Sequence, residues 1–102
     1  MSTLDKLSAT IAARKSASPD TSWTAKLLSQ GVEKCAEKFG EEAVEAIVAA
    51  VKGDKQNLTQ EAADALFHLM VMLEASSVPF ADVLAELERR EGVSGLVEKA
   101  NR

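Results

Sequence analysis

The apolar residues of this chain recur mainly every three or four positions, which is the spacing of an amphipathic helix. Near the start of the chain, Leu4, Leu7 and Ile11 follow this spacing. They predict a first helix over residues 3–15. The next segment, 16–20, is rich in turn-forming residues and is expected to end this helix as a loop.

A second and longer helical region is expected up to about residue 52. Thr21 or Ser22 is suited to begin it, because a short hydroxyl side chain accepts a hydrogen bond from a free backbone N–H at a helix start. Gly31 and Gly40 lie inside this region, and a glycine costs a helix up to about 1 kcal/mol relative to alanine. The pattern therefore allows a bend or a brief break at either glycine.

Two further helices complete the pattern. Asn57 is the expected cap of a third helix, which runs to about residue 76. Pro79 is expected as the first residue of a fourth helix that ends near residue 90, because proline is well tolerated at that position. Residues 93–102 are expected to form either a short helix or a frayed end.

The composition supports an all-α fold. Aromatic residues make up only 4% of the 102 residues, and alanine, leucine, valine, glutamate and lysine dominate, a bias that favours helices packed through aliphatic side chains. A hydrophobic fraction of 46% is enough for a core in a chain with room for one domain. We therefore expect a four- to five-helix bundle in a single domain over residues 1–102, with its core between about residues 4 and 90.

Charge and cysteine content argue against several classes of protein. The chain carries 12 basic and 16 acidic residues, and the basic ones form no block that would follow a nucleic acid backbone. Cys35 and His68, each the only residue of its kind, cannot form an internal disulfide or a zinc cage. No apolar run forms a signal peptide or reaches the roughly 18 residues of a membrane span. We expect a soluble, cytoplasmic protein without nucleic acid or membrane partners.

Three glutamates stand close together in the second helical region. At 100° per residue, Glu41 and Glu45 lie within about 40° of each other on the helix surface, with Glu42 to one side. An apolar stripe adjoins them and is formed by Val44, Ile47, Val48 and Val51. The three glutamates are therefore expected at the edge of a buried surface, although such a trio by itself is more often a solvated acidic face.

The third helix adds two acidic residues in an unusual setting. Residues 62–73 are apolar nearly all round, which is the pattern of a helix enclosed by others. The polar exceptions are Asp64 and His68, and with Glu61 they fall on one stripe of about 60°. Because an unpaired buried carboxylate is costly, Asp64 is expected to require a cation or a proton.

A divalent cation would satisfy all of these carboxylates. Oxygen ligands favour Mg²⁺, or alternatively Mn²⁺, and the facing helices of a bundle commonly provide such sites. The expected metal ligands are Glu41, Glu42, Glu45, Glu61 and Asp64. A di-iron site is set aside, because it would need two Glu-x-x-His pairs and the chain has a single histidine.

Two lysines and the histidine lie near these acids. Lys34 and Lys38 share the face of Glu41 and Glu45, where they either bind substrate phosphates or form ion pairs on the helix surface. His68 is expected in the core or beside the metal ligands, in preference to being a ligand itself.

The acidic residues also carry a resemblance. The run KFGEEAVE at 38–45, followed by EAAD at 61–64, resembles the E-E-x-x-E … E-x-x-D signature of the all-α nucleotide pyrophosphohydrolases. Further stretches are similar to the phosphoribosyl-ATP pyrophosphohydrolase family, and they lie at 22–27, 31–34, 64–69 and 86–90. The resemblance covers residues 4–90. One departure is Trp23, where the family more often has tyrosine.

This resemblance implies a specific activity. Members of the family release pyrophosphate from phosphoribosyl-ATP and leave phosphoribosyl-AMP, the second step of histidine biosynthesis, with Mg²⁺ on the signature carboxylates. It implies a homodimer. The chemistry of the reaction adds a hypothesis, namely that one glutamate among Glu41, Glu42 and Glu45 orients or deprotonates the water while the others hold metal. Two other functions stay open, namely a housecleaning nucleoside triphosphate pyrophosphohydrolase and a non-enzymatic helical adaptor whose acidic face is a docking surface.

Overall fold

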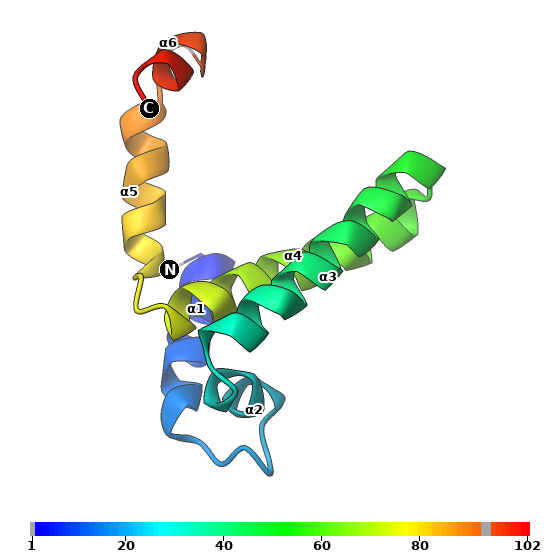
Figure 1. Cartoon of the computed structure of the whole chain (residues 1–102), viewed down its shortest axis with the longest axis vertical. Coiled ribbons are helices and arrows are strands. Elements are labelled where there is room, and N and C mark those ends of the chain that lie inside the picture. Colours follow the sequence, from blue (N-terminus) through cyan, green and yellow to red (C-terminus); the bar gives the residue numbers. More distant parts are fainter. Residues whose placement is uncertain (1, 93–94) are drawn as a thin grey trace.

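The computed structural model of the chain describes residues 2–92 and 95–102, and within them the secondary structure is helical throughout (Figure 1). The helices are α1 (Thr3–Ala13), a short 3₁₀ turn η1 (Arg14–Ser16), α2 (Trp23–Ser29), α3 (Val32–Lys52), α4 (Lys55–Ala75), α5 (Phe80–Arg90) and α6 (Gly95–Ala100). The all-α expectation is confirmed. The expected short C-terminal helix is present as α6, and the part of that expectation at 93–94 lies outside the described residues.

The long second helical region is divided at only one of its two glycines. Gly31 has a φ of +90°, a conformation that side-chain-bearing residues avoid, and it separates α2 from α3. Gly40 lies inside α3, which continues through it without a break. The start of the region is confirmed at Ser22, whose hydroxyl accepts a hydrogen bond of 3.1 Å from the backbone N–H of Ala25.

The start of α4 differs from the expectation. Asn57 is not the cap; the side chain of Asp54 takes that place and accepts a 3.0 Å hydrogen bond from the backbone N–H of Asn57. Gly53 precedes it with a left-handed φ of +74° and closes α3. Gly53 and Asp54 together make a two-residue connection, so α3 and α4 form an antiparallel hairpin. Pro79 likewise precedes α5 as its cap instead of being its first residue.

The core lies at one end of this hairpin. The core cluster of buried side chains is Ile11, Leu27, Cys35, Met70 and Val71, so α1, α2, the start of α3 and the end of α4 all contribute. The thiol of Cys35 donates a hydrogen bond of 3.2 Å to the backbone carbonyl of Leu27. Burial also raises the pKa of this thiol, so Cys35 serves packing.

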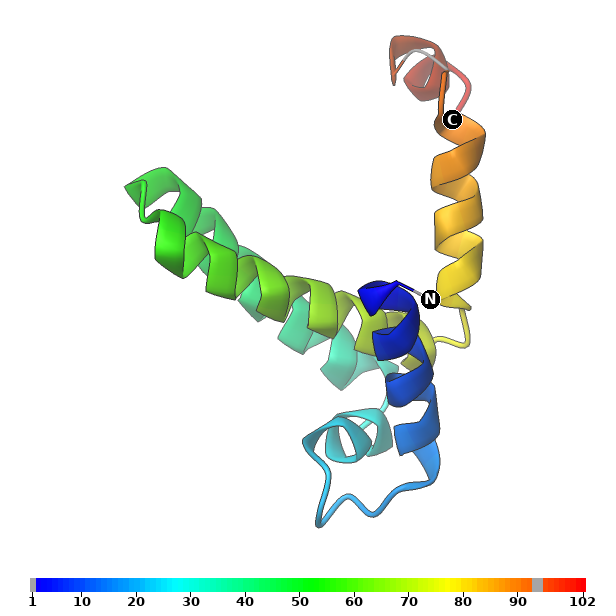
Figure 2. The same ribbon diagram turned by 180° about the vertical axis from the view of Figure 1, so that it is seen from behind.

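Two parts of the chain extend away from the core. The far half of the α3–α4 hairpin projects to one side, and α5 leaves the end of α4 at a bend of 112° (Figures 1 and 2). The radius of gyration is 15.4 Å, against about 13 Å for a compact chain of this length. The projecting segments therefore expose apolar surface that a compact fold would bury.

No single helix in the described part of the chain is both long and apolar enough to cross a membrane. Only α4 and α5 taken together reach the required length and composition, and the 112° bend separates them.

Candidate metal centre

The hairpin connection decides which residues of α3 face which residues of α4. In an antiparallel pair joined by a tight turn, residues at equal distance from the turn lie opposite one another. Glu45 and Glu61 are each eight residues from Gly53, and Glu42 and Asp64 are each eleven residues from it. The hairpin therefore brings the acidic residues of the two helices to the same level.

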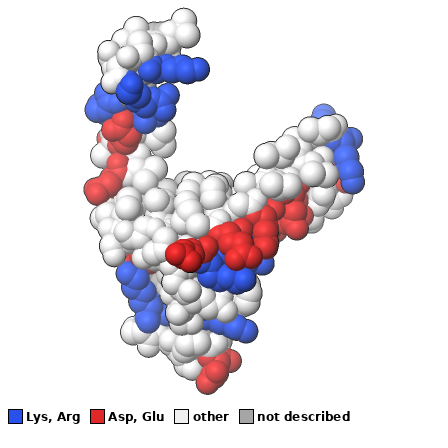
Figure 3. Space-filling model, viewed as in Figure 1, with Lys and Arg blue, Asp and Glu red and all other residues white. Residues whose placement is uncertain are grey.

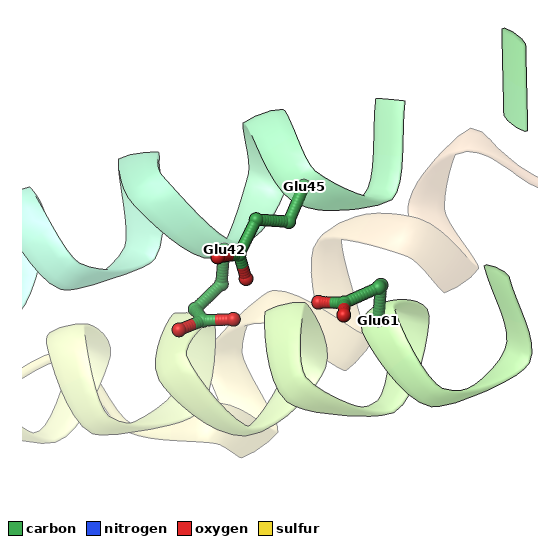
Figure 4. A group of neighbouring side chains, drawn as sticks. All are labelled: Glu42, Glu45 and Glu61. Atoms are coloured by element: carbon green, nitrogen blue, oxygen red, sulfur yellow. The ribbon is translucent and has the colours of Figure 1, made fainter. Parts of the chain in front are cut away.

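Three carboxylates meet between the two helices. Glu42 and Glu45 reach from α3 and Glu61 from α4, and all three point toward the space between the helices (Figure 4). One oxygen from each lies within 4.8 Å of the others. Such a group can provide several oxygen ligands to one cation.

The proximity of these acids changes their ionisation. A hydrogen bond to Glu45, loss of water contact and the negative charges of Glu45, Asp64 and Glu61 raise the pKa of Glu42 to about 7. Loss of water contact is the main cause that raises the pKa of Glu61, and Glu45 and Asp64 add to it. Glu42 and Glu61 therefore hold a proton more readily than isolated glutamates do, because ionisation places negative charges side by side.

The cluster also has an unsatisfied acceptor. Oxygen Oε2 of Glu61 is buried and finds no hydrogen-bond partner among the residues that the structure describes. An ionised carboxylate can only accept hydrogen bonds, so its neighbours Glu42 and Glu45 cannot satisfy it while they are charged. A hard divalent cation bound by oxygen would satisfy this atom and remove the repulsion, so the donor set fits Mg²⁺ or Mn²⁺.

Glu41, which was also expected as a ligand, lies at the edge of this cluster. Its carboxylate accepts a hydrogen bond of 3.1 Å from the ammonium of Lys38. Lys34 forms an ion pair of 3.5 Å with Glu37. Both lysines therefore make the helical ion pairs that were one of their two expected roles. Figure 3 shows the acidic side chains as a continuous band along α3, with basic side chains directly beside it.

The expected burial of Asp64 is wrong. Asp64 is exposed, and so are Ala62, Ala63 and Leu66 around it. The first half of α4 packs against α3 in the projecting part of the hairpin, and no other described helix encloses it (Figures 1 and 2). Asp64 still acts on the site, because its charge raises the pKa of both Glu42 and Glu61.

The apolar stripe beside the glutamates is exposed as well. Its members are Val44, Ile47, Val48 and Val51, and Val51 is 84% exposed. They lie about 100° to 160° round α3 from Ala49, which is buried and faces α4. The stripe is therefore on the side of α3 away from α4. The carboxylates lie between the face of α3 that packs against α4 and the exposed apolar stripe.

His68 is in the core, in agreement with the expectation. It is 7% exposed, lies opposite Lys38 in the hairpin, and packs edge-on against Phe67 with ring centroids 5.1 Å apart. Burial is the main cause that lowers its pKa, and the charge of Lys38 lowers it further. The imidazole is therefore held neutral near the acids.

A depression in the surface around α2 had no role among the expectations from the sequence. This open depression of about 630 Å³ is lined by residues between 19 and 30, among them Trp23 and Lys26. The two side chains are three residues apart on one helix, a spacing that places them on the same face. That spacing, and their place in the family-like stretch 22–27, were the signals for them in the sequence.

Comparisons with known proteins agree with the acidic signature. The sequence profile described as phosphoribosyl-ATP pyrophosphohydrolase matches residues 4–91. A protein from Dinoroseobacter shibae named phosphoribosyl-ATP pyrophosphatase is 72% identical over all 102 residues, with both chains fully covered. Proteins of the same name from Jannaschia sp. and Cereibacter sphaeroides are 68% and 67% identical, and cover 100% of this chain with 100% and 99% of their own length. With its carboxylate cluster in the helical hairpin, the chain belongs to the phosphoribosyl-ATP pyrophosphohydrolase family.

Proposed function

We propose that this chain hydrolyses phosphoribosyl-ATP to phosphoribosyl-AMP and pyrophosphate, in histidine biosynthesis, at the carboxylate cluster between α3 and α4. The observation that carries the proposal is the convergence of Glu42, Glu45 and Glu61 within 4.8 Å, with a buried oxygen of Glu61 unpartnered among the described residues. A non-enzymatic adaptor offers no reason to bring three like charges together at such a cost.

The metal ligands in this proposal are drawn from Glu41, Glu42, Glu45, Glu61 and Asp64. When bound, Mg²⁺ or Mn²⁺ neutralises phosphate charge and stabilises the leaving pyrophosphate. Asp64 is exposed beside the cluster, so its carboxylate is accessible to a cation that also contacts Glu42. Because Asp64 is exposed, a nucleotide can reach the carboxylate cluster from the side on which Asp64 lies.

The reaction adds water across the bond between the α and β phosphates. The water oxygen bonds to the α phosphorus, the bond from that phosphorus to the bridging oxygen breaks, and pyrophosphate leaves. A carboxylate among Glu41, Glu42 and Glu45 orients the water and accepts its proton.

Lys34 and Lys38 are the proposed contacts for the departing phosphates. Among the described residues, each pairs only with a glutamate one turn away on α3, at 3.5 and 3.1 Å. Ion pairs of this kind between partly exposed side chains are weak. Each ammonium can therefore exchange its glutamate for a phosphate oxygen at little cost.

We propose that the working form is a homodimer in the cytoplasm. The exposed stripe Val44, Ile47, Val48 and Val51 is an apolar helix face without cover from the described residues of its own chain. Exposed apolar side chains in such a row are typical of a surface that binds a partner. A single buried, free Cys35 agrees with a reducing compartment.

The test is release of pyrophosphate from phosphoribosyl-ATP, ATP and a deoxynucleoside triphosphate, each with Mg²⁺ and with chelator. We expect release from phosphoribosyl-ATP with Mg²⁺ only. Glu45→Gln and Asp64→Asn should each lower kcat by orders of magnitude with the helical circular dichroism unchanged. Preference for the deoxynucleotide would support the housecleaning function, and no release from any of the three compounds would support the adaptor.

A further inference from the structure

The depression beside α2 has the size and the chemistry of a ligand site. Its volume of about 630 Å³ lies within the range of roughly 300–1,000 Å³ that small-molecule sites occupy. Trp23 stands on its wall with 55% of its surface exposed, although it is the largest apolar side chain in the protein. A large exposed indole in a concave surface is a platform on which a flat ring can stack.

The polar groups around Trp23 are available for a ligand. Lys26 is exposed, and neither its ammonium nor the Trp23 ring N–H has a hydrogen bond or ion pair to any residue that the structure describes. Asp20 lies on the rim. One ammonium with one nearby carboxylate suits a single phosphate on a sugar, since the carboxylate can accept hydrogen bonds from sugar hydroxyls but would repel a polyphosphate.

The position of the depression relative to the carboxylates suits a long substrate. α2 packs against both α3 and α4 and leads through Gly31 into α3. Glu42 is ten residues beyond Val32, which corresponds to about 15 Å along the helix. Figure 3 shows basic side chains on the same face as the acidic band, and below it toward the part of the molecule where Figure 1 places α2.

Phosphoribosyl-ATP is extended in the same way. Its triphosphate is at one end, its adenine is in the middle, and a ribose with a single phosphate is at the other end. ATP lacks that last portion. An enzyme that prefers phosphoribosyl-ATP therefore needs contacts well away from the bond that it cuts.

We infer that the depression lined by Trp23 and Lys26 is the specificity subsite for the phosphoribosyl end of the substrate. Trp23 stacks on the adenine ring or the sugar attached to it, and Lys26 pairs with the terminal monophosphate. This inference rests on the proposed function, because that function identifies the substrate whose far end the subsite receives.

The first experiment uses the fluorescence of Trp23. The chain has one tryptophan and no tyrosine, so its fluorescence reports on this side chain alone. Phosphoribosyl-AMP added to the full-length protein with Mg²⁺ should change the emission in a saturable way, and AMP should do so more weakly. Unchanged emission at phosphoribosyl-AMP concentrations that inhibit the reaction would overturn the inference.

The second experiment pairs a protein change with a substrate change. Lys26→Gln should raise KM for phosphoribosyl-ATP by about tenfold, as expected for loss of a charged hydrogen bond. The substrate change is an analogue of phosphoribosyl-ATP that lacks the terminal monophosphate, and Lys26→Gln should leave KM for this analogue unchanged. Trp23→Leu should raise KM for both compounds, and Trp23→Phe should retain most of the affinity. Lys55→Gln, an exposed lysine at the far tip of the hairpin, is the matched control.

The outcomes separate this inference from the proposed function. If the wild-type protein releases no pyrophosphate from phosphoribosyl-ATP, the proposed function fails. If the wild-type protein is active and Lys26→Gln affects both substrates equally or neither, the proposed function stands and the subsite is overturned.

Discussion

The ammonium of Lys38 lies 3.1 Å from a carboxylate oxygen of Glu41, one turn further along α3 and at the edge of the acidic cluster. This hydrogen bond is the main cause that raises the pKa of Lys38, and the charges of Glu42 and Glu45 add to it. Lys38 is therefore held as a cation next to the site where we propose that phosphates bind.

Lys38→Ala should lower kcat/KM for phosphoribosyl-ATP by about tenfold or more, because a charged contact to the substrate is lost. The charge of Lys38 also lowers the pKa of His68, so the same variant should raise that pKa. His68 is the only histidine, and its titration can be followed by NMR without overlap. Lys55→Ala is the control. Unchanged kinetics in Lys38→Ala would show that Lys38 makes no contact with the substrate and serves only its ion pair with Glu41.

The acidic cluster should make the metal-free protein less stable as pH rises. Glu42 has its pKa raised from 4.5 to about 7 by folding, so between these values the folded state binds a proton that the unfolded state does not. The stabilisation from this proton is complete below pH 4.5 and is lost as pH rises through about 7. Thermal unfolding in chelator should show a falling midpoint across this window.

Two comparisons test that assignment. Mg²⁺ should restore the midpoint at pH 7, since a bound cation replaces the proton and stabilises the folded state. Glu42→Gln should remove most of the pH dependence in chelator and should be more stable than the wild type at pH 7. A pH profile that is identical in wild type and Glu42→Gln would contradict the prediction.

The exposed stripe on α3 should hold two copies together. Val51→Asp places a charge at a position that is 84% exposed in the single chain, so the fold of that chain should tolerate it. We expect light scattering to give twice the chain mass of 10.9 kDa for the wild type and that mass once for the variant. Ala50→Asp, exposed on the same turn but outside the stripe, should remain dimeric. A monomeric wild type, or equal masses for both variants, would contradict the dimer.

Features that depend on local spacing were predictable from the sequence. The positions of α1, α4 and α5 follow from apolar periodicity and turn-forming residues, and their ends are within a few residues of the expectation. The choice between Gly31 and Gly40 was not predictable, because both are tolerated in a helix. The helix breaks at Gly31 because α2 packs against α3 and α4, and this tertiary packing is not visible in the sequence.

The candidate site was predictable in its members and not in its setting. Helical spacing placed Glu45 and Glu61 among the acids, and the hairpin brings them together. Periodicity also indicated that Asp64 has apolar neighbours, but it does not indicate whether anything covers them. Whether other helices cover these neighbours depends on tertiary packing, and in this chain Asp64 is exposed. A cation site is supported instead by the buried oxygen of Glu61 that has no partner among the described residues, and by the raised pKa of Glu42.

The two-residue connection at Gly53 and Asp54 has a consequence for how this protein can vary. Glu45 and Glu61 face each other because each is eight residues from Gly53. One residue added to either helix between them and the turn would rotate the acid beyond it by about 100° and take it out of the cluster. Insertions in the loop 16–20 leave this register untouched. The number of residues between Glu45 and Glu61 is therefore fixed by the metal site, a constraint on length that the rest of the chain does not share.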